Sequence, residues 1–253
     1  MNVSIYQAAA ALSAYDRNHE VIAENMASSS VNGFKRQGIS FSTVQAGLIP
    51  ALGTGEMGAN QHFLLPRTTS VTNFEPGQTK YSGAKTDVAI DGAGFFEIQL
   101  PQGSTYYTRD GEFKLNSKGQ LTTKGGGLVM GQGGKPMQFD MTKVNEIIIL
   151  PSGEAKQGDN IVGKLNIVQF DDQQLLTSIG NGNFLADSPN LVPIPARDAK
   201  VSQGFLEGSN ATPMKEMAAL LTNIRQYETN QQVIQMHDER MGRAIATLGE
   251  TGG

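Results

Sequence analysis

The sequence predicts an α+β protein whose N- and C-terminal helices pair as a coiled coil and whose central domain is all-β. At both ends of the chain, apolar residues recur at alternating spacings of three and four, as on one face of a helix. Between them, short apolar alternations are separated by Gly, Asn and Asp, as in antiparallel strands joined by turns. We therefore expect helical segments at residues 1–36 and 210–250, an extended linker or contact segment at 37–81, and a β domain at 82–209.

The first helix is expected from about Ser4 to Ser29, and Asn32-Gly33 provides a stop signal after it. A polar residue at a core position of a coiled coil typically fixes the register, so His19 is interpreted as a register residue and not as a catalyst. The predicted seam of this helix consists of Ile5, Ala8, Leu12, Tyr15, His19, Ile22 and Met26.

The second helix is expected from the cap Thr212-Pro213 to about Leu248. An antiparallel register with Ile5 near Leu248 would place His19 within a turn of Asp238. Packing of both helices against the central domain is the alternative. The seam predicted for this helix contains Met217, Leu220 or Leu221, Ile224, Tyr227, Gln231, Ile234, Asp238, Met241, Ile245 and Leu248.

Seams interrupted by polar residues make isolated helices only marginally stable, so we expect both helices to become ordered when they dock. Between them, the Gly-rich stretch from Gly38 to Tyr81 shows little pattern beyond a possible strand near Thr68–Val71. Strands of the β domain are expected near 88–90, 96–100, 107–109, 113–115, 121–130 (interrupted by Gly125-Gly126-Gly127), 147–149, 165–170 and 184–185.

No pattern in the sequence indicates catalysis, a cofactor or a metal. The chain has no Cys, and its three His are not at metal-ligand spacing. The run Asp91-Gly92-Ala93-Gly94 enters a predicted strand and not a helix, and Gly131–Pro136 lacks the Ser or Thr of a phosphate loop. Most Asp residues occupy turn positions. We therefore expect a protein that is not an enzyme and has no catalytic, cofactor-binding or metal residues.

Charge and hydropathy exclude two classes of partner. The net charge is −4 and no run of Lys and Arg could follow a phosphate backbone, so nucleic acid is not expected as a partner. No apolar stretch approaches the roughly 20 residues that cross a bilayer, so membrane insertion is not expected. A cleavable signal peptide is not recognisable either.

Three blocks of sequence resemble the flagellar rod and hook protein family. The first runs from Asn25 through Gly33-Phe34-Lys35 and departs from the family pattern at Ser28-Ser29-Ser30. The second comprises Asp87–Phe96 with Tyr107–Phe113. The third, Gln203–Asn210, includes Gly208-Ser209-Asn210 and is followed by Met217 and Arg225–Glu228. The blocks span almost the whole chain in the family's order.

The resemblance implies a structural subunit that assembles helically with copies of itself and other flagellar rod proteins into the periplasmic rod of the basal body. It also implies export through the flagellar type III export apparatus without a cleavable signal peptide. The chain's length and the ending Asp238–Ala244 favour the proximal rod, adjoining the distal rod, whereas Arg109-Asp110-Gly111 also suits the distal rod. A β-domain adhesin with helical oligomerisation arms is the alternative class, although the absence of Trp argues against a sugar-binding platform.

Overall fold

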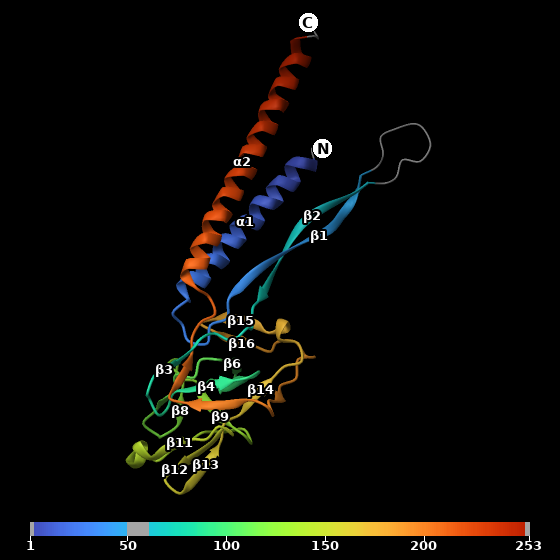
Figure 1. Cartoon of the computed structure of the whole chain (residues 1–253). Helices are drawn as coiled ribbons and strands as arrows, with labels where there is room; N and C mark the ends of the chain where they lie inside the picture. The colour runs from blue at the N-terminus through green and yellow to red at the C-terminus, as the bar shows by residue number, and fades with distance from the viewer. Residues whose placement is uncertain (1–2, 50–60, 251–253) are drawn as a thin grey trace. The chain divides into compact units, whose positions relative to one another are not determined.

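The computed structural model describes residues 3–49 and 61–250 (Figure 1). The chain forms two compact units. The helical unit comprises residues 1–26, 37–71 and 213–253, and the β unit comprises residues 27–36 and 72–212. The polypeptide therefore passes between the units at four places, after residues 26, 36, 71 and 212.

The helical unit contains α1 (Val3–Ala27) and α2 (Pro213–Glu250). Both begin and end within about two residues of the expected bounds. Pro213 opens α2, where its missing N–H costs no helical hydrogen bond. The predicted α+β class, mostly β with a helix near each terminus, is confirmed. The coiled-coil pairing of the helices stays a prediction.

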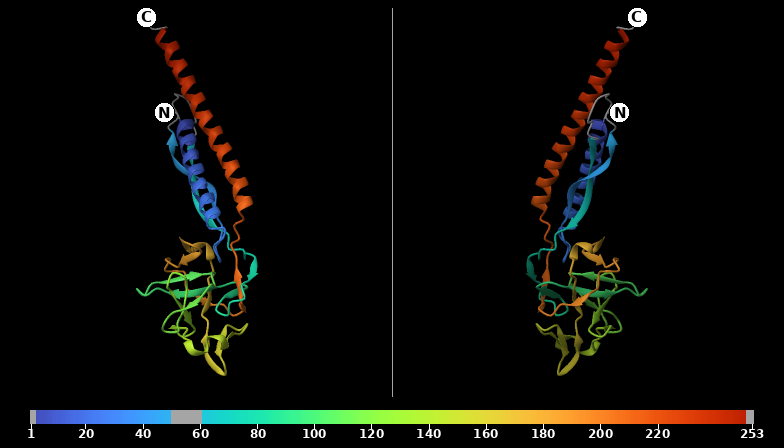
Figure 2. Two further views of the ribbon diagram at one scale, coloured as in Figure 1. Left: turned by 90° about the vertical axis from the view of Figure 1, so that its left-hand side faces the viewer. Right: turned by 90° about the vertical axis from the view of Figure 1, so that its right-hand side faces the viewer.

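The helical unit also contains two long paired strands, β1 (Gln37–Ile49) and β2 (Gln61–Thr72) (Figure 2). The Ser42 hydroxyl donates to the carbonyl of Arg67 (3.4 Å), and the Thr69 hydroxyl donates to the carbonyl of Ser40 (3.5 Å). Much of the segment expected to be an extended linker is thus a two-stranded sheet. The strand expected near Thr68–Val71 lies within β2, and the rest of this sheet was not predicted.

In the β unit, short strands are joined by tight turns. Two short 3₁₀ helices, η1 (Met141–Glu146) and η2 (Gln173–Leu175), interrupt them. The strands are β3 (Thr79–Tyr81), β4 (Val88–Asp91), β5 (Phe95–Gln99), β6 (Thr105–Thr108), β7 (Lys114–Leu115), β8 (Leu121–Thr122), β9 (Leu128–Gly131), β10 (Lys135–Pro136), β11 (Ile147–Ile149), β12 (Glu154–Gln157), β13 (Asn160–Lys164), β14 (Ile167–Gln169), β15 (Thr177–Gly180), β16 (Asn183–Leu185), β17 (Ile194–Pro195), β18 (Lys200–Gln203) and β19 (Phe205–Glu207).

The largest sheet has ten described strands in the order β15-β16-β6-β5-β9-β8-β7, with β10 beside β9 and with β14 pairing both β5 and β17. A three-stranded sheet, β11-β12-β13, and the pairs β18-β4 and β19-β3 complete the unit. The strand pairs of the β unit are antiparallel, as the alternating pattern predicts.

The β unit has an aromatic core on both faces of β5. Because successive strand residues point to opposite faces, Phe96 and Ile98 join one cluster and Phe95 joins another. Phe96 packs edge-on against Phe113 at 5.1 Å between ring centres, and Phe95 packs edge-on against Phe184 at 5.7 Å. These buried rings give the β unit a hydrophobic core of its own.

Candidate assembly site

On α2, half of the predicted seam positions are exposed, and the residue just before most of them is covered instead. Leu220, Tyr227 and Ile234 are partly covered, as expected of seam residues. Alternating with them along the helix, the covered positions other than Ala219 are polar, namely Glu216, Asn223, Asn230 and His237. These four recur once per heptad, so the covered stripe alternates apolar and polar layers.

The remaining seam positions of α2 are exposed where the structure describes them. Met217 is 56% exposed, Ile224 36% and Met241 45%. Gln231 and Asp238 are also exposed. The side chains of Ile5, Ile245 and Leu248 lie outside the part of the chain whose side chains are described.

On α1 the covered stripe is displaced in the same direction. Ile22 is buried, and Leu12, Tyr15 and Met26 are partly covered, but His19 is exposed. Asn18, its neighbour, is the polar residue that faces α2. The interpretation of His19 as the register residue is therefore wrong for the pairing of α1 with α2, and Asn18 occupies that role.

Hydrogen bonds between the helices fix an antiparallel register. Asn18 Nδ2 donates to Asn223 Oδ1 (2.8 Å), and Asn223 Nδ2 donates to the carbonyl of Tyr15 (3.0 Å). One heptad away, Asn25 Nδ2 donates to Glu216 Oε2 (3.3 Å). Continued along both helices, this register brings position 5 level with position 236. The expected match of Ile5 with Leu248 is thus wrong by about twelve residues, or roughly 18 Å.

Asn25 also binds the first residue of β1. Its Nδ2 donates to the carbonyl of Gln37 (2.7 Å), and its Oδ1 accepts from the backbone N–H of Gln37 (2.8 Å). Asn25 and Glu216 are fully buried. We call these three residues the Asn25 clasp, because one amide side chain joins α1, β1 and the first turn of α2 within the helical unit.

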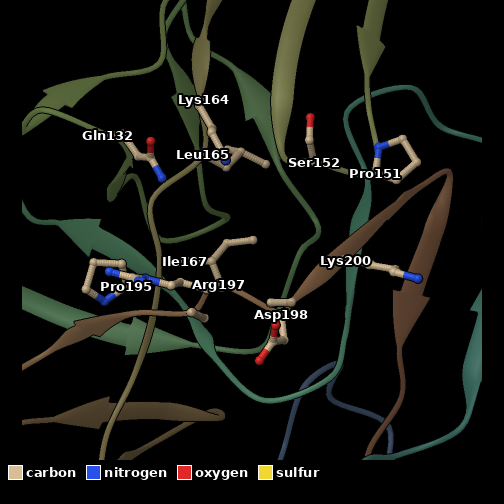
Figure 3. Close-up of a pocket in the computed structure, with 12 residues that line it drawn as sticks. Gln132, Pro151, Ser152, Lys164, Leu165, Ile167, Pro195, Arg197, Asp198 and Lys200 are labelled. Carbon is tan, nitrogen blue, oxygen red and sulfur yellow. The ribbon is translucent and has the colours of Figure 1, made fainter.

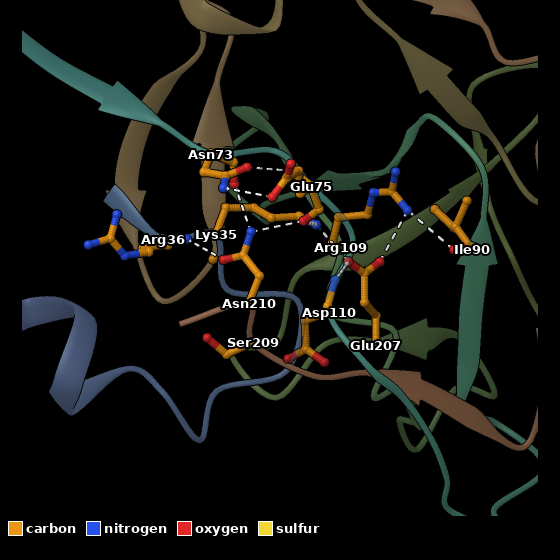
Figure 4. A network of polar contacts seen from close by, with 12 residues as sticks. Lys35, Arg36, Asn73, Glu75, Ile90, Arg109, Asp110, Glu207, Ser209 and Asn210 are labelled. Atoms are coloured by element: carbon orange, nitrogen blue, oxygen red, sulfur yellow. Dashed lines mark hydrogen bonds and ion pairs between the residues drawn. The ribbon is translucent and has the colours of Figure 1, made fainter. Parts of the chain in front are cut away.

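In the β unit, a buried carboxylate binds several segments together (Figure 4). Glu207 Oε1 accepts from Lys35 Nζ (2.6 Å) and from the backbone N–H of Gly77 (3.0 Å), and Glu207 Oε2 accepts from Arg109 Nη1 (3.1 Å). The carbonyl of Glu207 accepts from the N–H of Gly33 (2.7 Å). We call Gly33, Lys35, Gly77, Arg109 and Glu207 the Glu207 cluster.

Gly33 holds its place in the cluster because no side chain fits there. Its φ is +69°, in the left-handed region that glycine tolerates. A Cβ on Gly33 would lie 2.3 Å from the backbone nitrogen of Asp110. The turn after α1 can therefore lie directly against the backbone of residues 109–110.

Asn210 joins the same segments by a second route. Its Oδ1 accepts from the N–H of Arg36 (2.6 Å), and its Nδ2 donates to the carbonyls of Asn73 and Glu75 (both 2.9 Å). The three segments that lead into or out of the β unit, at residues 33–36, 72–77 and 207–210, are thus tied to one another inside it. Phe34, Gly208 and Ser209 lie on these segments as well, and Phe34 and Gly208 are buried.

Burial shapes the electrostatics of the cluster. Loss of hydration lowers the pKa of Lys35 below its ordinary value of 10.5, while the charge and hydrogen bond of Glu207 act against this shift. Burial lowers the pKa of Arg109 for the same reason, again opposed by Glu207. Glu207 is the described carboxylate that pairs with both cations, so the cluster depends on this one group.

Nothing in this arrangement resembles a reaction centre. The charged side chains of the Glu207 cluster are buried and bonded to backbone groups, as in a structural network. In residues 3–49 and 61–250, no group of three or more His, Asp or Glu side chains is placed to hold a metal ion. The described helices include none that is long and apolar enough to cross a membrane.

Known proteins match this chain over nearly its whole length. Residues 89–161 match the flagellar hook protein FlgE/F/G D1 domain, and residues 202–247 match the C-terminal region of flagellar basal body rod FlgEFG proteins. The flagellar basal-body rod protein FlgF of Caulobacter vibrioides is 31% identical over 234 residues, which cover 92% of this chain and 93% of the relative. The chain belongs to the flagellar basal-body rod protein family.

Two further rod proteins of the family are similarly close. FlgF of Mesorhizobium japonicum is 30% identical over 98% of this chain and 99% of its own length. FlgG of Agrobacterium fabrum is 33% identical over 92% of this chain and 94% of its own length. Both are named flagellar basal-body rod proteins, so the resemblance inferred from the three sequence blocks is confirmed.

The family motif residues fall in the two polar networks of this rod protein. Asn25 forms the clasp, and Gly33, Phe34, Lys35, Gly208, Ser209 and Asn210 lie on the segments tied together in the β unit. Sequence reasoning did not identify Glu207, Arg109 and Glu216 as partners in these networks, nor Asn223 as the partner of Asn18. The heptad spacing of Asn18 with Asn25, and of Glu216 with Asn223, was the signal that could have revealed the helical contacts.

Proposed function

We propose that the chain is a structural subunit of the flagellar basal-body rod, in the proximal part that adjoins the distal rod. Its terminal helices would form a coiled-coil layer by packing against further copies and other rod proteins. Family membership supports a structural and not an enzymatic role. A place in the distal rod is the alternative, because Arg109-Asp110-Gly111 also suits it.

The observation that carries this proposal is the apolar face that α2 leaves uncovered. Met214 is 83% exposed, Met217 56% and Leu221 59%, and Ile224 continues the same stripe. Their spacings of three, four and three place all four on one helix face. A soluble monomer rarely exposes contiguous apolar residues on this scale, so this face fits contact with another subunit.

The covered face points in the same direction. The hydrogen bonds between α1 and α2 join Asn18, Asn25, Glu216 and Asn223, which take up covered positions between apolar residues such as Ile22 and Leu220. A helix normally turns its apolar face inward and its polar face to water. In α2 much of the apolar surface faces outward, so the stronger hydrophobic contacts are left for neighbouring molecules.

We extend the proposal to the predicted seam and to export. Exposed seam residues such as Ile224 and Met241 would contact other copies, whereas Ile22 and Leu220 would support the pairing within one chain. Residues 37–81 would add contacts to neighbouring subunits. The subunit would leave the cytoplasm through the flagellar type III export apparatus without a cleavable signal, and its helices would become fully ordered on docking in the periplasmic rod.

A matched pair of variants tests the role of the exposed stripe. Met217→Glu/Leu221→Glu places two charges on the stripe, and Thr222→Glu/Gln226→Glu places two charges on exposed positions of another face of the same turns. We expect the first variant to abolish self-association of the full chain in sedimentation velocity, and rod assembly in cells, and the second to preserve both. Equal self-association of the two variants would reject the stripe as the assembly face.

The place of the subunit along the rod is tested by imaging. A small tag in the exposed turn at Ser117-Lys118 can be labelled on extracted basal bodies. Label at the proximal part of the rod supports the proposal, and label at the distal part supports the alternative. Assembled basal bodies without label would contradict both.

A further inference from the structure

A pocket of about 690 Å³ in the β unit is lined by an unusual number of cations for an acidic protein (Figure 3). Lys164 ends β13, Lys200 begins β18, and Arg197 lies on the connection between β17 and β18. Asp198 is the acidic side chain among the residues that line the pocket. The chain as a whole has a net charge of −4, so this pocket concentrates charge of the opposite sign.

The three cations are available to a ligand. Among the residues that the structure describes, none of them has a carboxylate within ion-pairing distance. Arg197 and Lys200 are exposed, and Lys164 is half-buried. Figure 3 shows them around the pocket on different sides, with Leu165 and Ile167 between them. The pocket thus combines an apolar floor with a cationic rim, which suits a ligand that carries both carboxylates and an apolar group.

A largely exposed segment with the complementary chemistry, Asp171–Leu175, lies elsewhere on the same unit, and we call it the protrusion. Asp171 and Asp172 are exposed, and Leu175, on the 3₁₀ turn η2, is 48% exposed. Asp172 caps this turn by accepting from the N–H of Gln174 (2.9 Å), so the turn holds a fixed shape. Asp171 has no such local role among the described hydrogen bonds.

The turn η2 and the part of the pocket formed by Pro151 and Ser152 lie toward different ends of the β unit. The pocket includes Pro151 and Ser152, in the turn between β11 and β12, whereas η2 leads directly into β15, an outer strand of the ten-stranded sheet. Figure 1 shows β15 and the β11-β12-β13 sheet at opposite ends of this unit. A protrusion on one copy could therefore enter the pocket of the next, and such head-to-tail contacts extend without closing.

We infer that the Lys164–Arg197–Lys200 pocket of one copy binds the Asp171–Leu175 protrusion of a second copy. This inference rests on the proposed rod function and adds to it an electrostatic contact between β units. The carboxylates of Asp171 and Asp172 would meet the cationic rim, and Leu175 would cover part of the apolar floor. The contact would orient subunits that the exposed face of α2 holds together.

Disulfide trapping tests the inference directly, because the chain has no cysteine of its own. Full-length Lys200→Cys is mixed with full-length Asp171→Cys under a mild oxidant. The control mixes Asp171→Cys with Lys118→Cys, which replaces an exposed lysine on another turn. Because a native contact raises the effective concentration of the two thiols, we expect the first mixture to form disulfide-linked dimers at least about tenfold faster.

Charge reversal provides a second readout. Lys200→Glu should weaken self-association roughly tenfold, and Lys200→Glu/Asp171→Lys in one chain should restore it by reversing the charges at both sides of each contact. Equal trapping in the two mixtures, or no restoration by the double variant, would overturn this inference while self-association through α2 remained. A wild-type chain that does not self-associate at all would overturn the proposed function as well.

Discussion

Buried polar side chains have different roles in the two units of this rod protein. In the β unit, aromatic side chains such as Phe95, Phe96 and Phe113 form the core, and the buried charges of Lys35, Arg109 and Glu207 tie the entering and leaving segments together. In the helical unit, polar side chains form the described bonds between α1 and α2, and an apolar stripe of α2 stays exposed although Val21 and Ile22 of α1 are buried.

We infer that the β unit provides most of the stability and that the helical unit provides most of the assembly contacts. We expect the β unit to be stable without neighbouring subunits, because burial of apolar surface is the dominant favourable term in folding. Each satisfied hydrogen bond between the helices adds only about 1 kcal/mol, and the exposed apolar stripe of α2 stays available to other molecules. A rod protein of this kind would thus reach the assembly site with a folded β unit and with a helical unit that is stabilised by contacts to neighbouring subunits.

The largest effect is expected from Glu207→Gln in the β unit. The substitution leaves Lys35 and Arg109 buried without their shared negative partner, which typically costs about 3–5 kcal/mol. We expect this loss in urea unfolding of the full chain, followed by near-ultraviolet circular dichroism of the β-unit aromatics. Glu75→Gln is the control, because the exposed Glu75 carboxylate bonds only to the exposed side chain of Asn73 among the described groups. Similar unfolding of both variants would show that the Glu207 cluster does not stabilise the unit.

A smaller effect is expected from Asn25→Ala in the helical unit. The substitution leaves the N–H and carbonyl of Gln37 without their amide partner and removes one bond to Glu216, at a cost of about 2–3 kcal/mol. Because a unit with little apolar core has little stability to lose, we expect helicity at 222 nm to fall while the near-ultraviolet signal of the β unit is kept.

Asn230→Ala is the matched control for the clasp. Among the described groups, Asn230 donates only to the carbonyl of Gln226, one turn earlier in α2, so its loss should leave helicity nearly unchanged. Equal loss of helicity in the two variants would mean that Asn25 acts only through its own helix. Loss of the β-unit signal in Asn25→Ala would contradict the division of stability between the units.

Periodicity predicted the elements of this chain better than it predicted their contacts. The three-four spacing located both helices, and alternation located β4, β5, β6 and β11, because these signals are local to each segment. Periodicity did not distinguish the covered polar positions Asn18, Asn25, Glu216 and Asn223 from the exposed apolar positions beside them. A pattern of apolar residues at heptad spacing does not reveal polar residues that have the same spacing. Which of the two sets faces inward depends on the partner helix.

The Glu207 cluster was out of reach for a different reason. Lys35, Arg109 and Glu207 are far apart in sequence, and no period relates them. The family motif marked Lys35, but its partners depend on how the segments at 33–36, 72–77 and 207–210 meet after the β unit has formed. Long-range ion pairs of this kind follow from tertiary structure and not from local pattern.

The smallest effect is expected at alkaline pH in the β unit. Burial raises the pKa of Tyr106 and of Tyr107 above the ordinary value of 10.0, so the folded unit keeps these protons longer than the unfolded chain does. The corresponding stabilisation is fully present below pH 10.0 and is lost as the pH rises through the higher pKa values of the folded unit.

Tyr107→Phe keeps the ring that packs against Phe170 and removes one titrating group. Between about pH 9 and pH 11, urea unfolding of the wild type should therefore lose more stability than that of Tyr107→Phe, and this comparison cancels the opposite contribution of Lys35, whose pKa is lowered. Parallel pH profiles would mean that the Tyr107 hydroxyl titrates equally in the folded and unfolded chains, and that its burial does not stabilise the β unit in this pH range.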